Sequence, residues 1–123
     1  MEIEKAIRVS LRFLTESGFS LKDARLITKN LIDAELSGKK THGLIRLKEI
    51  KKQVDSGVVK TQNKIEVVRS RANCVYVKAN HKPAFIPLYL SLDIAIKKAK
   101  KSGLCVVGIK DAEYGSGFIG PIS

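Results

Sequence analysis

The sequence lacks the features that mark membrane, secreted and metal-containing proteins. In its 123 residues, no apolar run approaches the roughly 20 residues that a helix needs to cross a bilayer. The opening Met1-Glu2-Ile3-Glu4-Lys5 has acidic residues and no long apolar run behind them, which argues against a signal peptide. The two cysteines, Cys74 and Cys105, lie in apolar runs without metal-ligand spacing. We therefore expect two reduced, buried thiols, no metal and a cytoplasmic location.

Negative charge is also scarce, since 23 lysines and arginines oppose 12 acidic residues and give a formal net charge of +11. Such a surplus attracts phosphate and raises the alternative of a small nucleic-acid-binding module. The lysines, however, stand in short pairs on the expected polar faces of separate helices, and no aromatic residues interleave with them for base stacking. The pairs are Lys39-Lys40, Lys51-Lys52, Lys97-Lys98 and Lys100-Lys101. Solvated helix faces explain the charge best; attraction of an anionic substrate is compatible with it, and a nucleic-acid partner is disfavoured.

The first half of the chain predicts three amphipathic helices. The first apolar stripe ends at Gly18, and a third helix is expected over about residues 44–54, with Gly57 as its terminator. Ser20 stands at an N-cap position of the second helix, with Asp23 three residues later as an imperfect capping box. The stripes are Ile3, Ile7, Leu11 and Leu14; Ala24, Ile27, Leu31 and Ala34; and Leu47, Ile50 and Val54.

The second half adds strands to the pattern. β-Rich runs at 65–68 and 74–77 are separated by a short polar turn. A long helix follows, with Pro87 in its first turn and Gly103 at its end. The continuous apolar run at 104–109 then suits a fully buried strand. The apolar face of the long helix is formed by Leu88, Leu92, Ala95, Ile96 and Ala99.

These elements predict an α+β (α/β) fold, in which N-terminal helices precede strands and a long helix packed on a partial sheet. We expect a helical region over residues 1–58 and the start of an α/β core over residues 59–123. The glycine-rich segment 114–123 follows the buried strand and then stops. The core is therefore expected to be incomplete at its C-terminal end.

One short segment between the second and third helices combines side chains suited to acid–base and anion chemistry. In Lys40-Thr41-His42-Gly43-Leu44-Ile45-Arg46, His42 is expected at a helix N-terminus, with Arg46 one turn further on the same face. An imidazole can protonate the carbonyl oxygen of a 2-oxo acid near neutral pH. A guanidinium binds a carboxylate through two hydrogen bonds. The hydroxyl of Thr41 can cap the helix, orient the imidazole or contact substrate.

The same segment is compatible with a plain structural role. Thr41 can act as an ordinary N-cap, with Arg46 as a surface residue. The spacing of histidine and arginine alone does not separate these interpretations.

The segment resembles a motif of the malate/L-lactate dehydrogenase superfamily, which includes ureidoglycolate, sulfolactate and diketogulonate enzymes. There the second helix ends in glycine and is followed by Ser-His-Gly-x-x-Arg. This chain has Gly38 and then Thr41-His42-Gly43-Leu44-Ile45-Arg46, with threonine in place of serine. Ser56-Gly57 resembles the turn after the third helix of the family, and residues 92–100 and 106–109 resemble its long helix and following strand. The resemblance runs over nearly the whole chain in the same order.

The resemblance implies the N-terminal part of a non-Rossmann, NAD(P)-dependent dehydrogenase fold, so the absence of Gly-x-Gly-x-x-Gly is no objection. It implies an oligomeric oxidoreductase that interconverts 2-hydroxy and 2-oxo acids with NAD or NADP. By correspondence, His42 would transfer the proton, and Arg46 would bind the substrate carboxylate, with Thr41 beside them. Family members are much longer, and the residues that hold their cofactor lie mostly beyond the equivalent of Ser123. We therefore expect the isolated chain to be inactive.

The chain departs from the family pattern at two places. The family carries a second histidine after the buried strand, in a pattern like Asn-Ser-x-His-Phe-Gly. Here Glu113 and Tyr114 stand nearest that position, and Tyr114 is the candidate for the catalytic role, although a phenol is a much weaker acid than an imidazolium. Before the long helix, family members carry an acidic, glycine-rich turn where this chain has residues 77–84. His81 in that segment is interpreted as a loop residue rather than a ligand.

Two alternatives to an oxidoreductase fragment make different predictions. A nucleic-acid-binding module requires lysines from several helices to converge on one face, and binding that weakens steeply with salt. A non-catalytic remnant that binds a full-length relative predicts exposed apolar area around residues 104–109.

Overall fold

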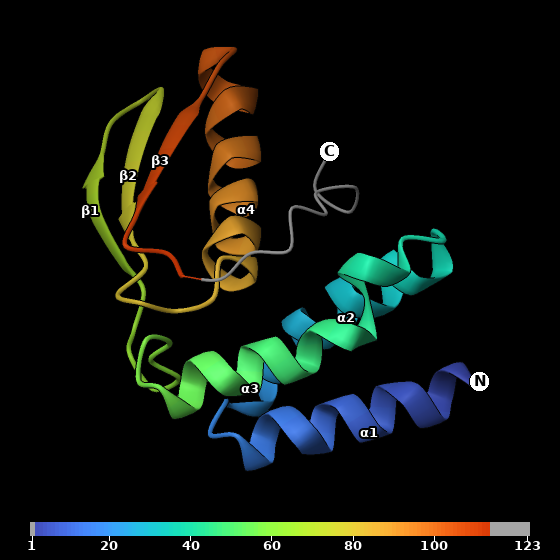
Figure 1. Cartoon of the computed structure of the whole chain (residues 1–123). Coiled ribbons are helices and arrows are strands. Elements are labelled where there is room, and N and C mark those ends of the chain that lie inside the picture. Colours follow the sequence, from blue (N-terminus) through green and yellow to red (C-terminus); the bar gives the residue numbers. More distant parts are fainter. Residues whose placement is uncertain (1, 114–123) are drawn as a thin grey trace.

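The computed structural model describes residues 2–113 and places a helical layer beside a layer of sheet and helix (Figure 1). The helical layer contains α1 (Ile3–Glu16), α2 (Leu21–Leu36) and α3 (Leu47–Asp55). The second layer contains β1 (Glu66–Ser70), β2 (Cys74–Lys78), α4 (Phe85–Ser102) and β3 (Val106–Lys110). This arrangement confirms the predicted α+β class and the predicted order of the elements.

The start of α2 is fixed by the residue that the sequence predicts. The Ser20 hydroxyl accepts a hydrogen bond from the Asp23 amide at 3.1 Å, which satisfies one amide of the first turn. The Asp23 carboxylate does not complete a capping box; it forms an ion pair with Lys82, from the segment before α4. Both side chains of this pair are about nine-tenths buried. The pair therefore links the first turn of α2 to the second layer.

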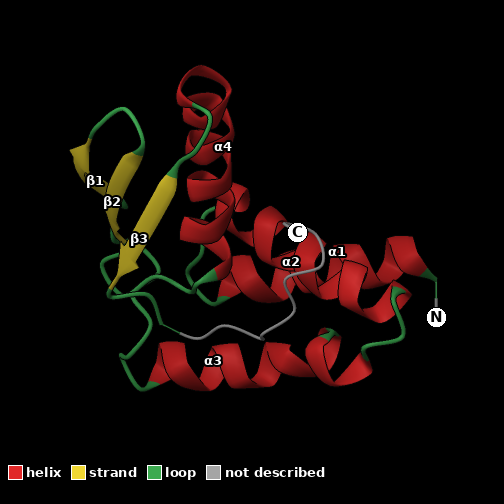
Figure 2. Ribbon diagram, turned by 90° about the horizontal axis from the view of Figure 1, so that it is seen from above, coloured by secondary structure: helices red, strands yellow, loops and turns green. Residues whose placement is uncertain are grey.

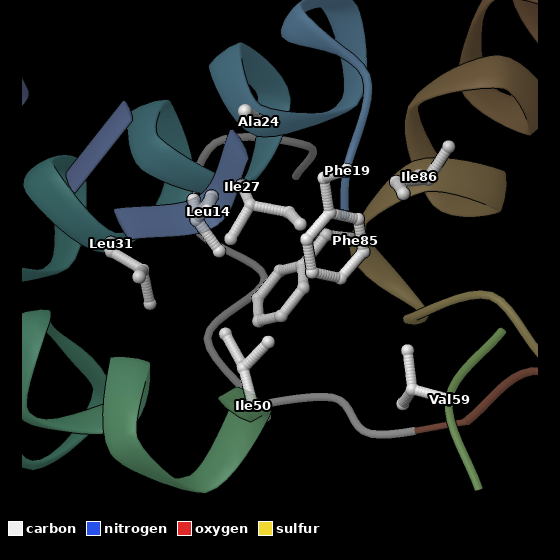
Figure 3. Packing of buried hydrophobic residues seen from close by; sticks show 9 residues of the cluster. All are labelled: Leu14, Phe19, Ala24, Ile27, Leu31, Ile50, Val59, Phe85 and Ile86. Carbon is white, nitrogen blue, oxygen red and sulfur yellow. The ribbon is translucent and has the colours of Figure 1, made fainter. Parts of the chain in front are cut away.

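One hydrophobic cluster joins the three N-terminal helices to the beginning of α4. The predicted stripe of α2 lies at its centre, because Ala24, Ile27 and Leu31 are completely buried. Figure 3 shows Phe19 and Phe85 projecting toward Ile27 and Ile50. The members of the cluster are Leu14, Phe19, Ala24, Ile27, Leu31, Ile50, Val59, Phe85 and Ile86. Because burying one such large side chain contributes about 1.5–3 kcal/mol, Phe85 and Ile86 anchor α4 firmly to the helices.

The sheet has the order β1-β2-β3, with β1 antiparallel to β2 and β2 parallel to β3. Side chains of a strand alternate between the two faces of a sheet. Val75 and Val77 of β2 are buried under α4, whereas Tyr76 between them is exposed on the other face. Helix α4 therefore covers one face of the sheet in the part of the chain that the structure describes.

The prediction of a fully buried strand at 104–109 is wrong. Leu104 is 63% exposed and Val106 is 58% exposed. Among residues 2–113, β3 pairs only with β2 and is thus an edge strand, covered by α4 on one face. A continuous apolar run predicts burial only where neighbours cover both faces of the sheet. The exposed apolar area agrees with what the interaction-partner alternative predicts for this segment.

The predicted burial of both cysteines is also wrong. Cys74 is exposed at the start of β2, and Cys105 is half-buried just before β3. Both thiols are free, as expected. Their exposure follows from the same cause as that of β3, because within residues 2–113 the sheet is covered by α4 on one face only.

Both ends of α4 lie where the sequence predicts them. Pro87 lies in the first turn of α4, and Gly103 ends this helix with a φ of 84°, both as predicted. Among residues 2–113, no helix has the length and apolarity to cross a membrane, and no cluster of acidic, histidine or cysteine residues could hold a metal ion.

Candidate functional site

The connection between α2 and α3 consists of two short 3₁₀ turns, Lys40–His42 and Leu44–Arg46. The sequence predicted instead that the third helix begins near residue 44 and that His42 lies at its N-terminus. Gly43 separates the two turns because its φ of −92° and ψ of −143° are not helical. His42 therefore lies in a turn of its own, and α3 begins at Leu47.

Glu35, in the last turn of α2, holds this connection in place. Its Oε1 accepts a hydrogen bond from the Leu44 amide at 2.9 Å. A side chain at position 43 would overlap the Glu35 carboxylate, which explains why glycine stands there. The role of Glu35 was not predicted from the sequence, because Glu35 precedes the bonded amide by nine residues and belongs to the preceding helix. Thr41, the alternative N-cap, makes no capping hydrogen bond at α3.

The three predicted site residues Thr41, His42 and Arg46 form one connected group. The Thr41 hydroxyl lies 3.0 Å from Nδ1 of His42, so of the three roles considered for it, this contact fits orientation of the imidazole. The Nε of Arg46 donates to the Thr41 carbonyl oxygen at 2.6 Å. His42 and Arg46 are half-buried. The structure thus places an imidazole and a guanidinium in the same short loop.

The hydrogen bonds of this group leave its reactive atoms available. Thr41 occupies Nδ1 of His42 and leaves Nε2 for another partner. Arg46 uses Nε, and within residues 2–113 its two Nη atoms donate no hydrogen bond. Two Nη donors in one plane match the two oxygens of a carboxylate. The group can therefore present one acid–base nitrogen and one carboxylate-binding fork.

A second group of polar side chains lies where the sheet meets the helices. Nδ1 of His81 lies 2.7 Å from Oε1 of Glu113. The neighbouring Lys82 forms the buried ion pair with Asp23. His81 lies in a turn, as predicted, but its pairing with Glu113 across 32 positions was not foreseen. Tyr114, the predicted replacement for the second histidine, lies outside the described residues.

The length of α2 separates the two groups. Asp23 lies in its first turn beside Lys82, and Glu35 lies in its last turn beside Gly43. The intervening helix rises by about 18 Å, at about 1.5 Å per residue. Figure 2 shows the connection between α2 and α3 far from the sheet, and Figure 1 shows the same separation. His42 and the His81–Glu113 pair therefore do not share one pocket within residues 2–113.

The amino-acid sequence of the chain is similar to that of a known protein family. The sequence profile of malate/L-lactate dehydrogenase matches residues 1–121. The chain belongs to the malate/L-lactate dehydrogenase family. The segment with Thr41, His42 and Arg46 lies within the match.

Several curated members of the malate/L-lactate dehydrogenase family match the chain over most of its length. The malate dehydrogenase of Pyrococcus horikoshii is 32% identical over 104 residues, which are 85% of this chain and 29% of that enzyme. The malate/(S)-sulfolactate dehydrogenase of Methanothermus fervidus is 28% identical over 104 residues, 85% of this chain and 31% of that enzyme. The chain thus spans about a third of the length of these relatives.

Solved structures agree with the fold. The structure of malate dehydrogenase from Pyrococcus horikoshii superposes with a TM-score of 0.88 at 30% identity, covering 94% of this chain and 33% of that one. The sulfolactate dehydrogenase from Methanocaldococcus jannaschii also superposes with a TM-score of 0.88, at 22% identity, covering 92% of this chain and 33% of that one. The similarity to the sulfolactate dehydrogenase supports only the assignment of the fold.

The family implies a nicotinamide cofactor, but two helix starts among residues 2–113 do not fit its pyrophosphate. A dinucleotide pyrophosphate is commonly bound by free amides at a helix N-terminus. At α2, Ser20 already accepts a hydrogen bond from the first turn. At the turn that leads into α3, Glu35 accepts one from Leu44 and supplies a negative charge of its own. At each of these two positions, an amide that could bind a pyrophosphate is therefore already occupied.

Proposed function

We propose that this chain supplies the acid-binding part of an NAD(P)-dependent oxidoreductase that interconverts 2-hydroxy and 2-oxo acids. The proposal rests on one observation, the connected group of Thr41, His42 and Arg46 in a loop fixed by Glu35. Its chemistry suits a small anion with a hydroxyl or oxo group next to a carboxylate. The net charge of +11 favours the approach of such an anion.

Each residue of the group has a distinct task in this proposal. The Nη atoms of Arg46 bind the substrate carboxylate through paired hydrogen bonds. Nε2 of His42 exchanges a proton with the substrate oxygen, while Thr41 holds Nδ1 and with it the plane of the ring. Glu35 positions the loop through Leu44 and does not contact the substrate.

The remaining features of the proposal come from the family. The cofactor is NAD or NADP, the active form is a cytoplasmic homo-oligomer, and Tyr114 takes the place of the second histidine of the family. Residues 1–58 bind the acid, and residues 59–123 begin the α/β core. We expect no turnover from the isolated chain, because it spans about a third of the length of the family members that it matches.

Binding of a substrate by the chain itself tests the first part of the proposal. Pyruvate and L-malate are titrated into the chain, and binding is measured by chemical shifts of the Arg46 and His42 side chains. Arg46→Lys keeps the charge but loses the planar fork, so we expect affinity to fall by about tenfold. Arg12→Lys is the matched control, because Arg12 is an exposed arginine that pairs with Glu16. Equal affinities of the two variants would refute the assignment of Arg46.

A chimaera tests the catalytic part of the proposal. Residues 1–121 replace the matching segment of the Pyrococcus horikoshii malate dehydrogenase, and oxidation of NADH by 2-oxo acids is followed. We expect turnover from the chimaera and none from the chain alone. His42→Ala should lower kcat by about 10²–10⁴-fold, the range for a general acid–base group. A chimaera that works equally well without His42 would show that this residue is not the proton donor.

A further inference from the structure

The turn after β2 contains two consecutive residues in a backbone conformation that is rare outside glycine. Asn80 has a φ of 52° and His81 a φ of 66°. Directly after β3, Asp111 has a φ of 54°. Left-handed backbone costs free energy for side-chain-bearing residues, least for asparagine, aspartate and histidine, and it clusters at functional sites. The ends of two adjacent parallel strands thus carry three such residues close together.

Backbone hydrogen bonds hold this turn from several sides. The His81 amide donates to the Asp111 carbonyl oxygen at 2.8 Å, and the His81 carbonyl oxygen accepts from the Lys60 amide at 2.8 Å. The Glu113 amide donates to the Lys82 carbonyl oxygen at 2.9 Å. The buried side chain of Lys82 is fixed in turn by Asp23. The positions of His81 and Glu113 are therefore set by the backbone before their side chains interact.

The side chains of His81 and Glu113 then form a directed pair. Oε1 of Glu113 lies 2.7 Å from Nδ1 of His81, within the range of a charge-assisted hydrogen bond. A carboxylate at Nδ1 selects the neutral tautomer that carries its proton there, and it leaves the lone pair on Nε2. The His81 side chain is 51% exposed, and within residues 2–113 its Nε2 has no hydrogen-bond partner. Nε2 is thus the nitrogen of His81 that is available to bind a ligand.

We propose that His81 and Glu113 form a second acid-binding site, in which the lone pair on Nε2 of His81 accepts a hydrogen bond from the hydroxyl group of a small 2-hydroxy acid. Glu113 is the positioning residue and does not contact the ligand. The class of ligand rests on the proposed function. Lys78 and Lys110, paired at the ends of β2 and β3, add positive charge beside the turn and favour an anion. This site deepens the proposed function by adding an imidazole to a chain that lacks the second histidine of the family pattern.

The second site acts independently of Arg46 in the same chain. About 18 Å of helix lies between them, given the rise per residue of α2, and a three- or four-carbon acid cannot span that length. Each site therefore gives its own signal in a binding experiment. A purely structural ion pair would hold the two segments together but would not respond to ligand.

Nitrogen NMR on the complete 15N-labelled chain tests the inference. In the free protein we expect neutral His81 to carry its proton on Nδ1. L-Malate should shift the Nε2 resonance of His81 saturably, whereas glycerol, which has hydroxyls but no carboxylate, should not. Glu113→Gln should weaken binding at His81 on the order of tenfold, as losses of an orienting partner commonly do. Glu16→Gln, which removes the acid of an exposed helical pair, is the matched control and should bind as the parent chain does.

The outcomes separate this inference from the proposed function. The second site is supported if L-malate changes the chemical shift of His81 and Glu113→Gln weakens that change. This holds even if the Arg46 resonances do not respond and the proposed role of Arg46 fails. Shifts at Arg46 without any at His81 overturn the second site and leave the proposed function standing. A neutral His81 that carries its proton on Nε2 also overturns it. His81→Asn, which tolerates the left-handed backbone, should abolish the response at this site while keeping the fold. The titration of the unmodified chain decides the question even if a variant fails to fold.

Discussion

The carboxylate of Glu35 accepts a hydrogen bond from the Leu44 amide at 2.9 Å and lies directly against the α-carbon of Gly43. This contact joins the last turn of α2 to the turn that carries Arg46. It gives two neighbouring features of this chain, the glycine after His42 and the bend before α3, a single physical cause. A side chain at position 43 and the Glu35 carboxylate cannot occupy the same place.

Gly43→Ala should therefore destabilise the chain. The new methyl group displaces the Glu35 carboxylate and frees the Leu44 amide, and we expect a loss of about 1–3 kcal/mol in the free energy of unfolding. Urea denaturation measures the loss. Adding Glu35→Ala to Gly43→Ala should cost less than the sum of the two single changes, because both break one contact. Additive losses would show that the two residues act separately.

Asp23→Asn should destabilise the chain more strongly than the loss of an exposed pair. It leaves the Lys82 ammonium buried without its partner, for which we expect a cost of about 3–5 kcal/mol. Thermal or urea unfolding measures this loss. Replacing both members, with Asp23→Asn and Lys82→Met, should restore much of the stability, because no buried charge then remains unpaired. Asp55→Asn, which breaks the exposed pair with Lys51, is the control and should change little.

Ile27→Ala tests whether the cluster between α2 and α4 is the main core of the described chain. Ile27 is completely buried, so the change should cost about 2–5 kcal/mol through lost burial and a residual cavity. Val9→Ala, at a side chain that is 56% exposed, should cost far less. Urea unfolding followed by circular dichroism gives both values. Similar losses for the two variants would contradict the placement of the core.

Leu104→Lys tests the exposed edge beside β3. Leu104 is 63% exposed, and edge strands with apolar side chains promote association between chains. The variant should reduce concentration-dependent association in sedimentation while leaving the unfolding midpoint nearly unchanged. Leu21→Lys, at a position that is 49% exposed on α2, is the control and should not alter association. A large loss of stability in Leu104→Lys would instead indicate that this side chain is buried in solution.

The success of the sequence-based predictions depended on the range of the interactions involved. The stripe of Ala24, Ile27 and Leu31 and the cap at Ser20 were predicted correctly, because helical periodicity and capping involve residues three or four apart. Gly103 ends its helix for a similarly local reason, its left-handed backbone. The burial of the run at 104–109 was predicted wrongly. The apolar composition of this run is a property of the local sequence, but its burial depends on which strands and helices lie beside it.

The same distinction between local and long-range interactions applies to the candidate site. The amino-acid sequence by itself determined the helices and the order of the elements along the chain. It also indicated that Thr41, His42 and Arg46 lie close together, since they are neighbours along the chain. Only the tertiary structure decided that Glu35 fixes the loop and that His81 meets Glu113 across 32 positions. It also decided that His42 and His81 lie at opposite ends of α2. Contacts between distant segments depend on how helices and strands pack, and one sequence pattern is compatible with many such packings.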